Sequence, residues 1–123
     1  MILPCIASGN RVVAVPSLKA ALIVADFYQL LDTSDVPGGV INLVTGVPSE
    51  LATVLAAHDD VAAIWAVGPA DECEQIKIES AGNLKSVWTS DGKSPDWYDS
   101  QAEGSSWLER ATQVKNIWVP YGE

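Results

Sequence analysis

The chain has 123 residues, of which 48% are hydrophobic and 19% charged, and its formal net charge is −9. This length suits one domain with its own core, and the composition excludes a chain that is disordered throughout. The acidic balance argues against nucleic acid and anionic membrane surfaces as partners, because both are bound through Lys and Arg.

Four short apolar runs alternate with helical patterns along the first ninety residues. The predicted strands cover residues 11–15, 40–44, 61–67 and 84–88. The predicted helices cover residues 18–31, a segment beginning at Pro48, and about 71–81. Strands that alternate with helices, one of them apolar almost throughout, indicate an α/β fold with a parallel sheet and right-handed crossovers. The first helix is apolar on nearly all sides, so it is expected to be covered by its neighbours.

The character of the sequence changes after the fourth strand. Residues 90–106 are polar and rich in Asp, Ser and Gly, which is typical of a linker. A short helical piece is expected at 107–111, and a last strand at 112–119 ends at Pro120. That strand has no following partner of its own. Of the five tryptophans, Trp65 and Trp88 are predicted to pack in the core. Trp97, Trp107 and Trp118 lie in or beyond the linker, where a partner is expected to cover them.

Cys5 and Cys73 lie far apart and form no CxxC unit, which favours a reduced, cytoplasmic protein over a disulfide scaffold. A zinc site would have to combine both thiols with His58, and no ligand spacing supports it, so no metal is predicted. His58 itself suits a surface or capping role. No apolar run is long enough to span a bilayer, and no export signal is recognised.

Four segments, in order, resemble the aldehyde dehydrogenase superfamily. Residues 7–13, Ala-Ser-Gly-Asn-Arg-Val-Val, are similar to the family's A-A-G-N-T-V-V. Residues 35–46 contain Pro-Gly-Gly-Val-Ile-Asn-Leu-Val-Thr-Gly, similar to P-P-G-V-L-N-V-V-T-G, and residues 58–61 resemble H-P-D-V. Residues 111–118, Ala-Thr-Gln-Val-Lys-Asn-Ile-Trp, resemble the closing Y-T-Q-V-K-T-V-W strand.

The resemblance implies a Rossmann-like parallel sheet with flanking helices plus a C-terminal oligomerisation strand. Residues 1–89 would be a remnant of the NAD domain, residues 90–106 a linker in place of the catalytic domain, and residues 107–123 the oligomerisation segment. In plan, the chain resembles the truncated, non-catalytic C-terminal region of family-16 aldehyde dehydrogenases. No residue is expected to be catalytic, because the domain that carries the family's nucleophilic cysteine has no counterpart.

The family's general-base glutamate lies in an E-L-G-G-K element that matches residues 89–93, so Thr89 takes its position. Asp91 would take it only if the alignment slipped by two residues. The K-P-S-E element that holds the adenosine ribose matches residues 15–18, where Val15 and Leu18 replace the two anchoring side chains. The F-T-G-S turn matches residues 66–69, where Pro69 replaces the serine.

The resemblance therefore implies a degenerate cofactor site with weak NAD binding at most. Its remaining residues are Pro16, Ser17, Gly46 and Gly68.

The function predicted from the sequence is a non-catalytic structural or assembly module of an aldehyde dehydrogenase complex. Its pairing strand would use Gln113, Val114, Lys115, Ile117 and Trp118. The partner would be another copy of the chain or an aldehyde dehydrogenase catalytic region. Two alternatives stay open: a degenerate NAD-binding domain, and half of an NAD-dependent oxidoreductase completed by another chain.

Overall fold

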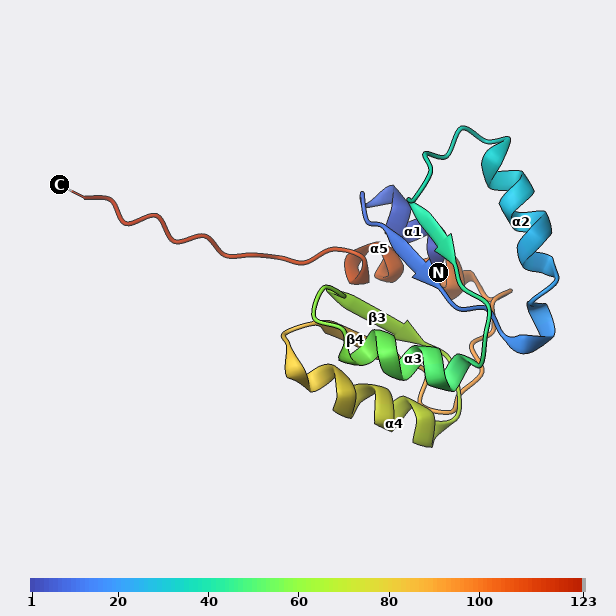
Figure 1. Ribbon diagram of the computed structural model, residues 1–123. Helices are drawn as coiled ribbons and strands as arrows, with labels where there is room; N and C mark the ends of the chain where they lie inside the picture. Colours follow the sequence, from blue (N-terminus) through green and yellow to red (C-terminus); the bar gives the residue numbers. More distant parts are fainter. Residues whose placement is uncertain (123) are drawn as a thin grey trace.

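The computed structural model describes residues 1–122, in which helices alternate with short strands (Figure 1). The strands are β1 (Val12–Ala14), β2 (Ile41–Leu43), β3 (Ala63–Ala66) and β4 (Ser86–Thr89). The α-helices are α1 (Ile2–Ala7), α2 (Ile23–Asp32), α3 (Pro48–Ala57), α4 (Ala70–Glu79) and α5 (Ser106–Arg110). Short 3-10 turns lie at Leu18–Ala20, Ser80–Gly82 and Ser100–Glu103. None of the described helices is long and apolar enough to cross a membrane.

The strands form two parallel pairs, so the predicted α/β fold with parallel strands is confirmed. β1 pairs with β2, placing Val12 opposite Ile41, and β3 pairs with β4, placing Trp65 opposite Trp88. Within the described residues, no strand joins β1 to β3, so the chain holds two small sheets where the sequence predicts one. Each strand is also shorter than its apolar run.

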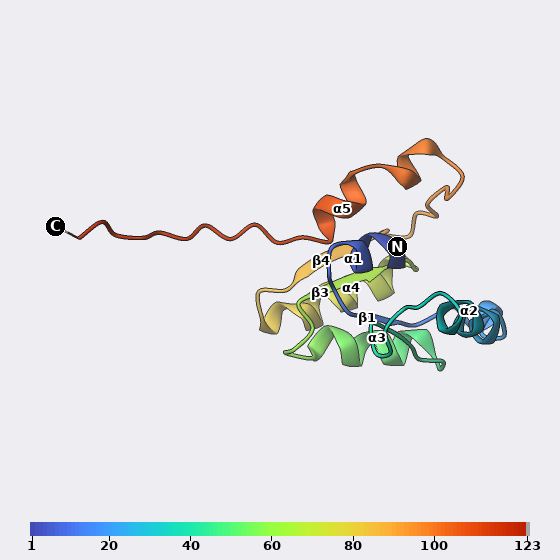
Figure 2. The same cartoon turned by 90° about the horizontal axis from the view of Figure 1, so that it is seen from above.

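The core lies where α3 and α4 pack against each other beside β3 and β4. Pro48 occupies the first turn of α3 and Glu50 follows in that turn, as expected for a helix start. Ala56 of α3 and Cys73 and Ile76 of α4 are buried, and Ile41 is the buried residue of β2. Figure 2 shows α5 on one side of the β3–β4 pair and α3 on the other. This arrangement leaves a small core for a chain of 123 residues.

Helix α2 differs from its prediction, because it has no buried residue in this chain. Leu22, just before it, is 89% exposed, and Ile23 and Leu30 are also exposed. A hydrogen bond of 2.9 Å from the Leu43 amide to the Tyr28 hydroxyl ties α2 to the end of β2. The expectation of a covered helix is therefore wrong for the isolated chain, whose core is too small to reach it.

Helix α1 was not predicted, because six residues are too few for a periodic pattern. It lies beside α5 and β1. The Asn10 amide, just after it, donates hydrogen bonds to the carbonyls of Cys5 (3.1 Å) and Ala111 (2.7 Å). Asn10 thus joins the two ends of the folded body.

Helix α5 is present close to its predicted position, and it covers the face of the β3–β4 pair that carries Trp65 and Trp88. The Trp107 ring lies 5.3 Å from that of Trp65 and 4.9 Å from that of Trp88. Trp97 of the linker lies 6.0 Å from Trp107. Trp65 and Trp88 pack as predicted, but Trp107 and Trp97 find their partners within the chain rather than in another protein.

Residues 112–122 form no helix or strand and run away from the folded body (Figure 1). We call residues 112–122 the tail. The strand predicted at 112–119 is therefore not formed in the single chain. A lone segment has no neighbour to accept and donate the backbone hydrogen bonds that define a strand.

Candidate functional site

The four residues expected at a cofactor site all follow strands at their carboxyl ends, where α/β folds bind ligands. Pro16 and Ser17 come after β1, Gly46 after β2 and Gly68 after β3. A cavity of about 760 Å³ lies between β1 and β3, and Gly68 lines it together with Val15. Pro16, Ser17 and Gly46 are not among its lining residues. The structure thus places the four at equivalent strand ends without bringing them into one pocket.

The turn from β3 into α4 is poorly equipped to hold a phosphate. The Gly68 amide already donates to the Ser90 hydroxyl at 3.2 Å, and Pro69 has no amide hydrogen. Asp71 and Glu72 fill the first turn of α4. A Cβ built on Gly68 would lie 3.5 Å from a carboxylate oxygen of Glu72. These acids stabilise the helix start but repel the anion that a helix N-terminus would otherwise attract.

Gly46 has a packing reason of its own, apart from any ligand. A Cβ at this position would lie 2.9 Å from Cδ1 of Leu51, in the first turns of α3. The glycine therefore lets the chain pass close to α3. Leu18, at the position where the resemblance implies a ribose-binding glutamate, is exposed and offers no polar atom from its side chain.

The segment expected at the general-base position forms a small ion-pair network on the surface. Lys77 of α4 lies 2.6 Å from the Asp91 carboxylate, and the Thr89 hydroxyl donates to the same oxygen at 2.6 Å. The hydrogen bond from Lys77, followed by that from Thr89, lowers the pKa of Asp91. Asp91 has a positive φ of 49°, and Gly92 follows at 78°, so the chain turns sharply just after β4. A base must be able to take up a proton near neutral pH, and this carboxylate is held in its charged form.

Neither cysteine is placed as an activated nucleophile. Cys5 is partly buried, and burial raises the pKa of its thiol, against the smaller opposing effect of the chain's amino terminus. Cys73 is buried, and its thiol donates to the Gly68 carbonyl at 3.6 Å. Both are free thiols. Reactive cysteines lie in partly exposed, electropositive settings, so the raised pKa of Cys5 and the burial of Cys73 both indicate packing residues.

His58 ends α3, and its Nδ1 accepts a hydrogen bond of 3.1 Å from the Asp60 amide. This is the local capping role expected of it. Among residues 1–122, no group of three or more His, Cys, Asp and Glu side chains is arranged to hold a metal ion.

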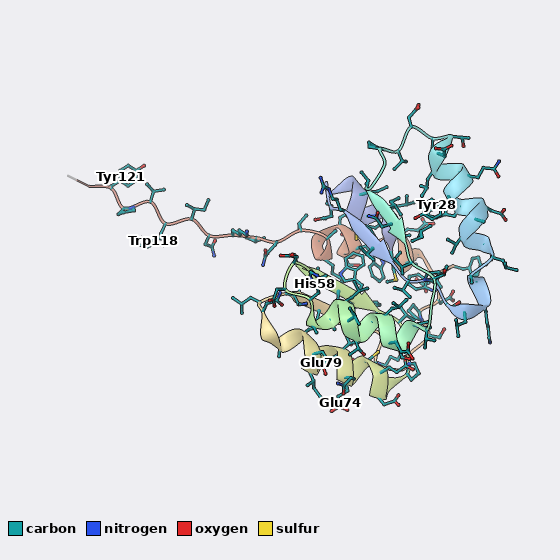
Figure 3. The ribbon with its side chains drawn as sticks, viewed as in Figure 1. Tyr28, His58, Glu74, Glu79, Trp118 and Tyr121 are labelled. Carbon is teal, nitrogen blue, oxygen red and sulfur yellow. The ribbon has the colours of Figure 1, made fainter. Side chains whose placement is uncertain are left out.

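The tail carries the residues predicted to pair with another chain. Val114, Ile117 and Trp118 are 89%, 83% and 92% exposed. Gln113 and Lys115, between and beside them, are also exposed. Figure 3 shows Trp118 and Tyr121 clear of the folded body. Within the described chain, no residue from 113 to 122 takes part in a hydrogen bond or ion pair.

Sequence reasoning missed the contribution of Arg110 to the packing that precedes the tail. Its guanidinium lies 5.8 Å from the ring centres of both Trp88 and Trp107. Such cation–π contacts hold α5 on the sheet face. A basic residue at the end of a short, tryptophan-containing helix was the only available signal, and it is a common one.

Comparison with known proteins assigns the chain to one family profile, described as the aldehyde dehydrogenase family and matched by residues 1–113. A (Z)-2-((N-methylformamido)methylene)-5-hydroxybutyrolactone dehydrogenase of Acinetobacter baylyi is 38% identical over 75% of this chain and 19% of its own length. A 2-aminomuconic semialdehyde dehydrogenase of Mus musculus is 37% identical over 70% of this chain and 18% of its own length. The NADP/NAD-dependent aldehyde dehydrogenase PuuC of Escherichia coli is 35% identical over 72% and 18%. The chain thus spans less than a fifth of these relatives.

Proposed function

The chain belongs to the aldehyde dehydrogenase family, and we propose that its role there is assembly rather than catalysis. In this proposal the tail adds as a strand to a sheet of another subunit or of an aldehyde dehydrogenase catalytic region. Strand addition supplies affinity through main-chain hydrogen bonds and specificity through alternate side chains.

The observation that carries the proposal is the exposed apolar tail. Val114, Ile117, Trp118 and Val119 lie in one short, exposed segment that makes no hydrogen bond with the rest of the described chain. Contiguous apolar surface of this kind marks interaction sites in soluble proteins. The arrangement at the strand ends supports the same proposal, because the Asp91 carboxylate is tied to Lys77 and α4 opens with two acids.

Light scattering coupled to size exclusion tests the proposal on the full chain and on a chain ending at Thr112. This cut is better than one before Trp107, since Trp107 packs on Trp65 and Trp88. The full chain is expected to elute as an assembly heavier than its 13.1 kDa, and the shortened chain at the monomer mass.

A matched control removes an equally exposed apolar side chain elsewhere. Leu22→Ser, at a residue as exposed as Val114, should leave the assembly intact. A monomer at every concentration, with or without the tail, would reject assembly through another copy. Saturable binding of NAD below about 1 mM would instead favour the cofactor-binding alternative.

A reducing cytoplasmic setting is proposed along with this role. Its support is that Cys5 and Cys73 are free thiols on different elements.

A further inference from the structure

Strand β1 has a free edge that faces the cavity. The Val12 amide donates to Val40 and the Ala14 carbonyl accepts from Val44, so residues 12 and 14 bond to the β2 side. Bonding direction alternates along a strand of a parallel pair, so the N–H and C=O of Val13 point to the opposite edge. Val12, Val13 and Ala14 line the cavity. Unused backbone donors and acceptors therefore lie along its β1 wall.

Strand β3 presents the same kind of edge from the other side. The carbonyls of Ala62 and Ala66 accept from Ser86 and Ser90, which assigns the even-numbered residues to the β4 side. The backbone groups of Ala63 and Trp65 are left for the opposite edge, and both residues line the same cavity. Figure 1 shows β1 and β3 running in the same sense. The cavity therefore separates two free, similarly directed strand edges.

We propose that this cavity is a strand-accepting slot, filled by residues 116–119 from the tail of a second copy of the chain. The added strand would bond to Val13 on one side and to Ala63 and Trp65 on the other. The two pairs would then join into one five-stranded sheet. This inference rests on the proposed assembly role and names its acceptor.

The tail has the composition that a central strand requires. Ile117, Trp118 and Val119 are consecutive apolar residues. Such runs are typical of strands that are buried on both faces of a sheet. Trp118 alone would bury roughly 150–250 Å². With two exchanged tails and an equal area on the acceptors, Trp118 contributes roughly 600–1,000 Å², and the flanking Ile117 and Val119 bring the total toward the area of roughly 1,200–2,000 Å² that stable dimers bury.

The tail of the same chain is poorly placed to fill its own slot. It leaves α5 beside the cavity, where the Ala111 carbonyl is held by Asn10 at 2.7 Å and the Thr112 amide bonds to Glu109 at 3.3 Å. From there it runs outward in both views (Figures 1 and 2). A second copy can enter without breaking these bonds, and reciprocal exchange closes a symmetric dimer.

Two full-length variants separate donor from acceptor. Ile117→Asp places a charge in the tail segment, and Val13→Pro removes the one amide hydrogen of β1 that faces the slot. Each variant alone is expected to raise the dimer dissociation constant about tenfold or more, as measured by analytical ultracentrifugation. Their mixture should form a heterodimer, because one intact tail meets one intact slot. Circular dichroism checks that Val13→Pro remains folded.

Each variant has a matched control. Gln113→Asp puts the same charge in the tail before the inserted segment. Val87→Pro makes the same substitution on the outer edge of β4, where the alternation set by Ser86 and Ser90 directs the amide away from β3. Both controls should dimerise like the wild type.

Hydrogen exchange of the wild-type dimer gives an answer even where a proline variant unfolds. The amides of Val13, Ala63 and Trp65 should be protected at concentrations above the dissociation constant and exposed below it. A dimer that needs Ile117 but leaves these amides unprotected, with Val13→Pro dimerising normally, would overturn the slot while preserving the assembly role. A wild-type monomer would reject both the slot and assembly through another copy, and protected slot amides in that monomer would show that the chain inserts its own tail.

Discussion

Asp91 lies near the position expected for a general base, but its carboxylate is engaged in other contacts. The family alignment brings an acid near the general-base position only by a two-residue slip. In the structure that acid accepts from Thr89 and pairs with Lys77 fourteen residues earlier. Both contacts favour the charged carboxylate.

The pKa of Asp91 should rise when Lys77 is replaced by Met, because the largest cause of its depression is removed. The pKa is expected to move toward that of an unperturbed aspartate. Carbon-detected NMR titration of the side-chain carboxyl measures it directly. Lys93→Met is the matched control, and it should move the pKa less, since the charge of Lys93 has the weakest effect on the Asp91 carboxyl.

The same depression fixes the sign of a stability effect. A carboxyl whose pKa is lower when folded adds stability above its unfolded pKa and loses it as the pH falls through the folded value. Lys77→Met should therefore weaken the pH dependence of unfolding below about pH 4. An Asp91 titration identical in the variant and the wild type would contradict this account.

At the scale of elements, α5 is the piece that completes the face of the β3–β4 pair. Register puts Trp65 opposite Trp88 on one face, and a two-stranded sheet cannot cover two indoles by itself. Trp107 lies against both rings and Arg110 over the rings of Trp88 and Trp107. The segment after the linker thus belongs to the folded body as far as Ala111, and the tail extends beyond that body.

Trp107→Ala should destabilise the folded chain by about 2 kcal/mol, because it removes the ring contacts with Trp65 and Trp88, worth about 0.5–1.5 kcal/mol each, together with some apolar burial. Urea unfolding followed by far-UV circular dichroism, at concentrations below any assembly, measures it. Trp118→Ala is the control at the same residue type, and its 92% exposed side chain should contribute less than about 0.5 kcal/mol there. Equal losses for the two variants would show that Trp107 does not hold the sheet face.

The whole molecule combines a small core with much exposed apolar surface. The buried apolar residues among those described are Ile41, Ala56, Cys73 and Ile76. The exposed apolar surface lies on α2 and on the tail, and the chain carries a net charge of −9. In the proposed assembly, two copies must bring apolar segments together against like-charge repulsion.

Association of two copies should strengthen as salt is raised from about 20 to 300 mM, because the Debye length shortens and the repulsion between acidic surfaces is screened. We expect the dimer dissociation constant, measured by sedimentation, to fall severalfold over this range. Ile117→Asp should show no comparable gain, since its defect lies in the buried segment. An affinity that weakens with salt would mean that opposite charges, rather than apolar strand addition, hold the dimer.

The sequence by itself determined the α/β class, the order of the elements and the positions of most of them. Turn residues such as Pro16 and Gly38–Gly39 and the first-turn Pro48 act locally, and local signals can be read without the fold. In the same way, the sequence alone predicted that Pro16, Ser17, Gly46 and Gly68 follow the ends of strands. The family match over residues 1–113 confirms the resemblance that these segments carried.

Only the tertiary structure decided which elements meet. The separation of β1 from β3, the exposure of α2, the docking of Trp107 and the pairing of Lys77 with Asp91 all join residues distant in sequence. An apolar run predicts that a segment is buried, but it does not indicate which other segment covers it. The pattern of residues 112–119 predicts a strand, but the single chain provides no neighbouring strand for it. A strand forms only where the backbone of another strand accepts and donates its hydrogen bonds.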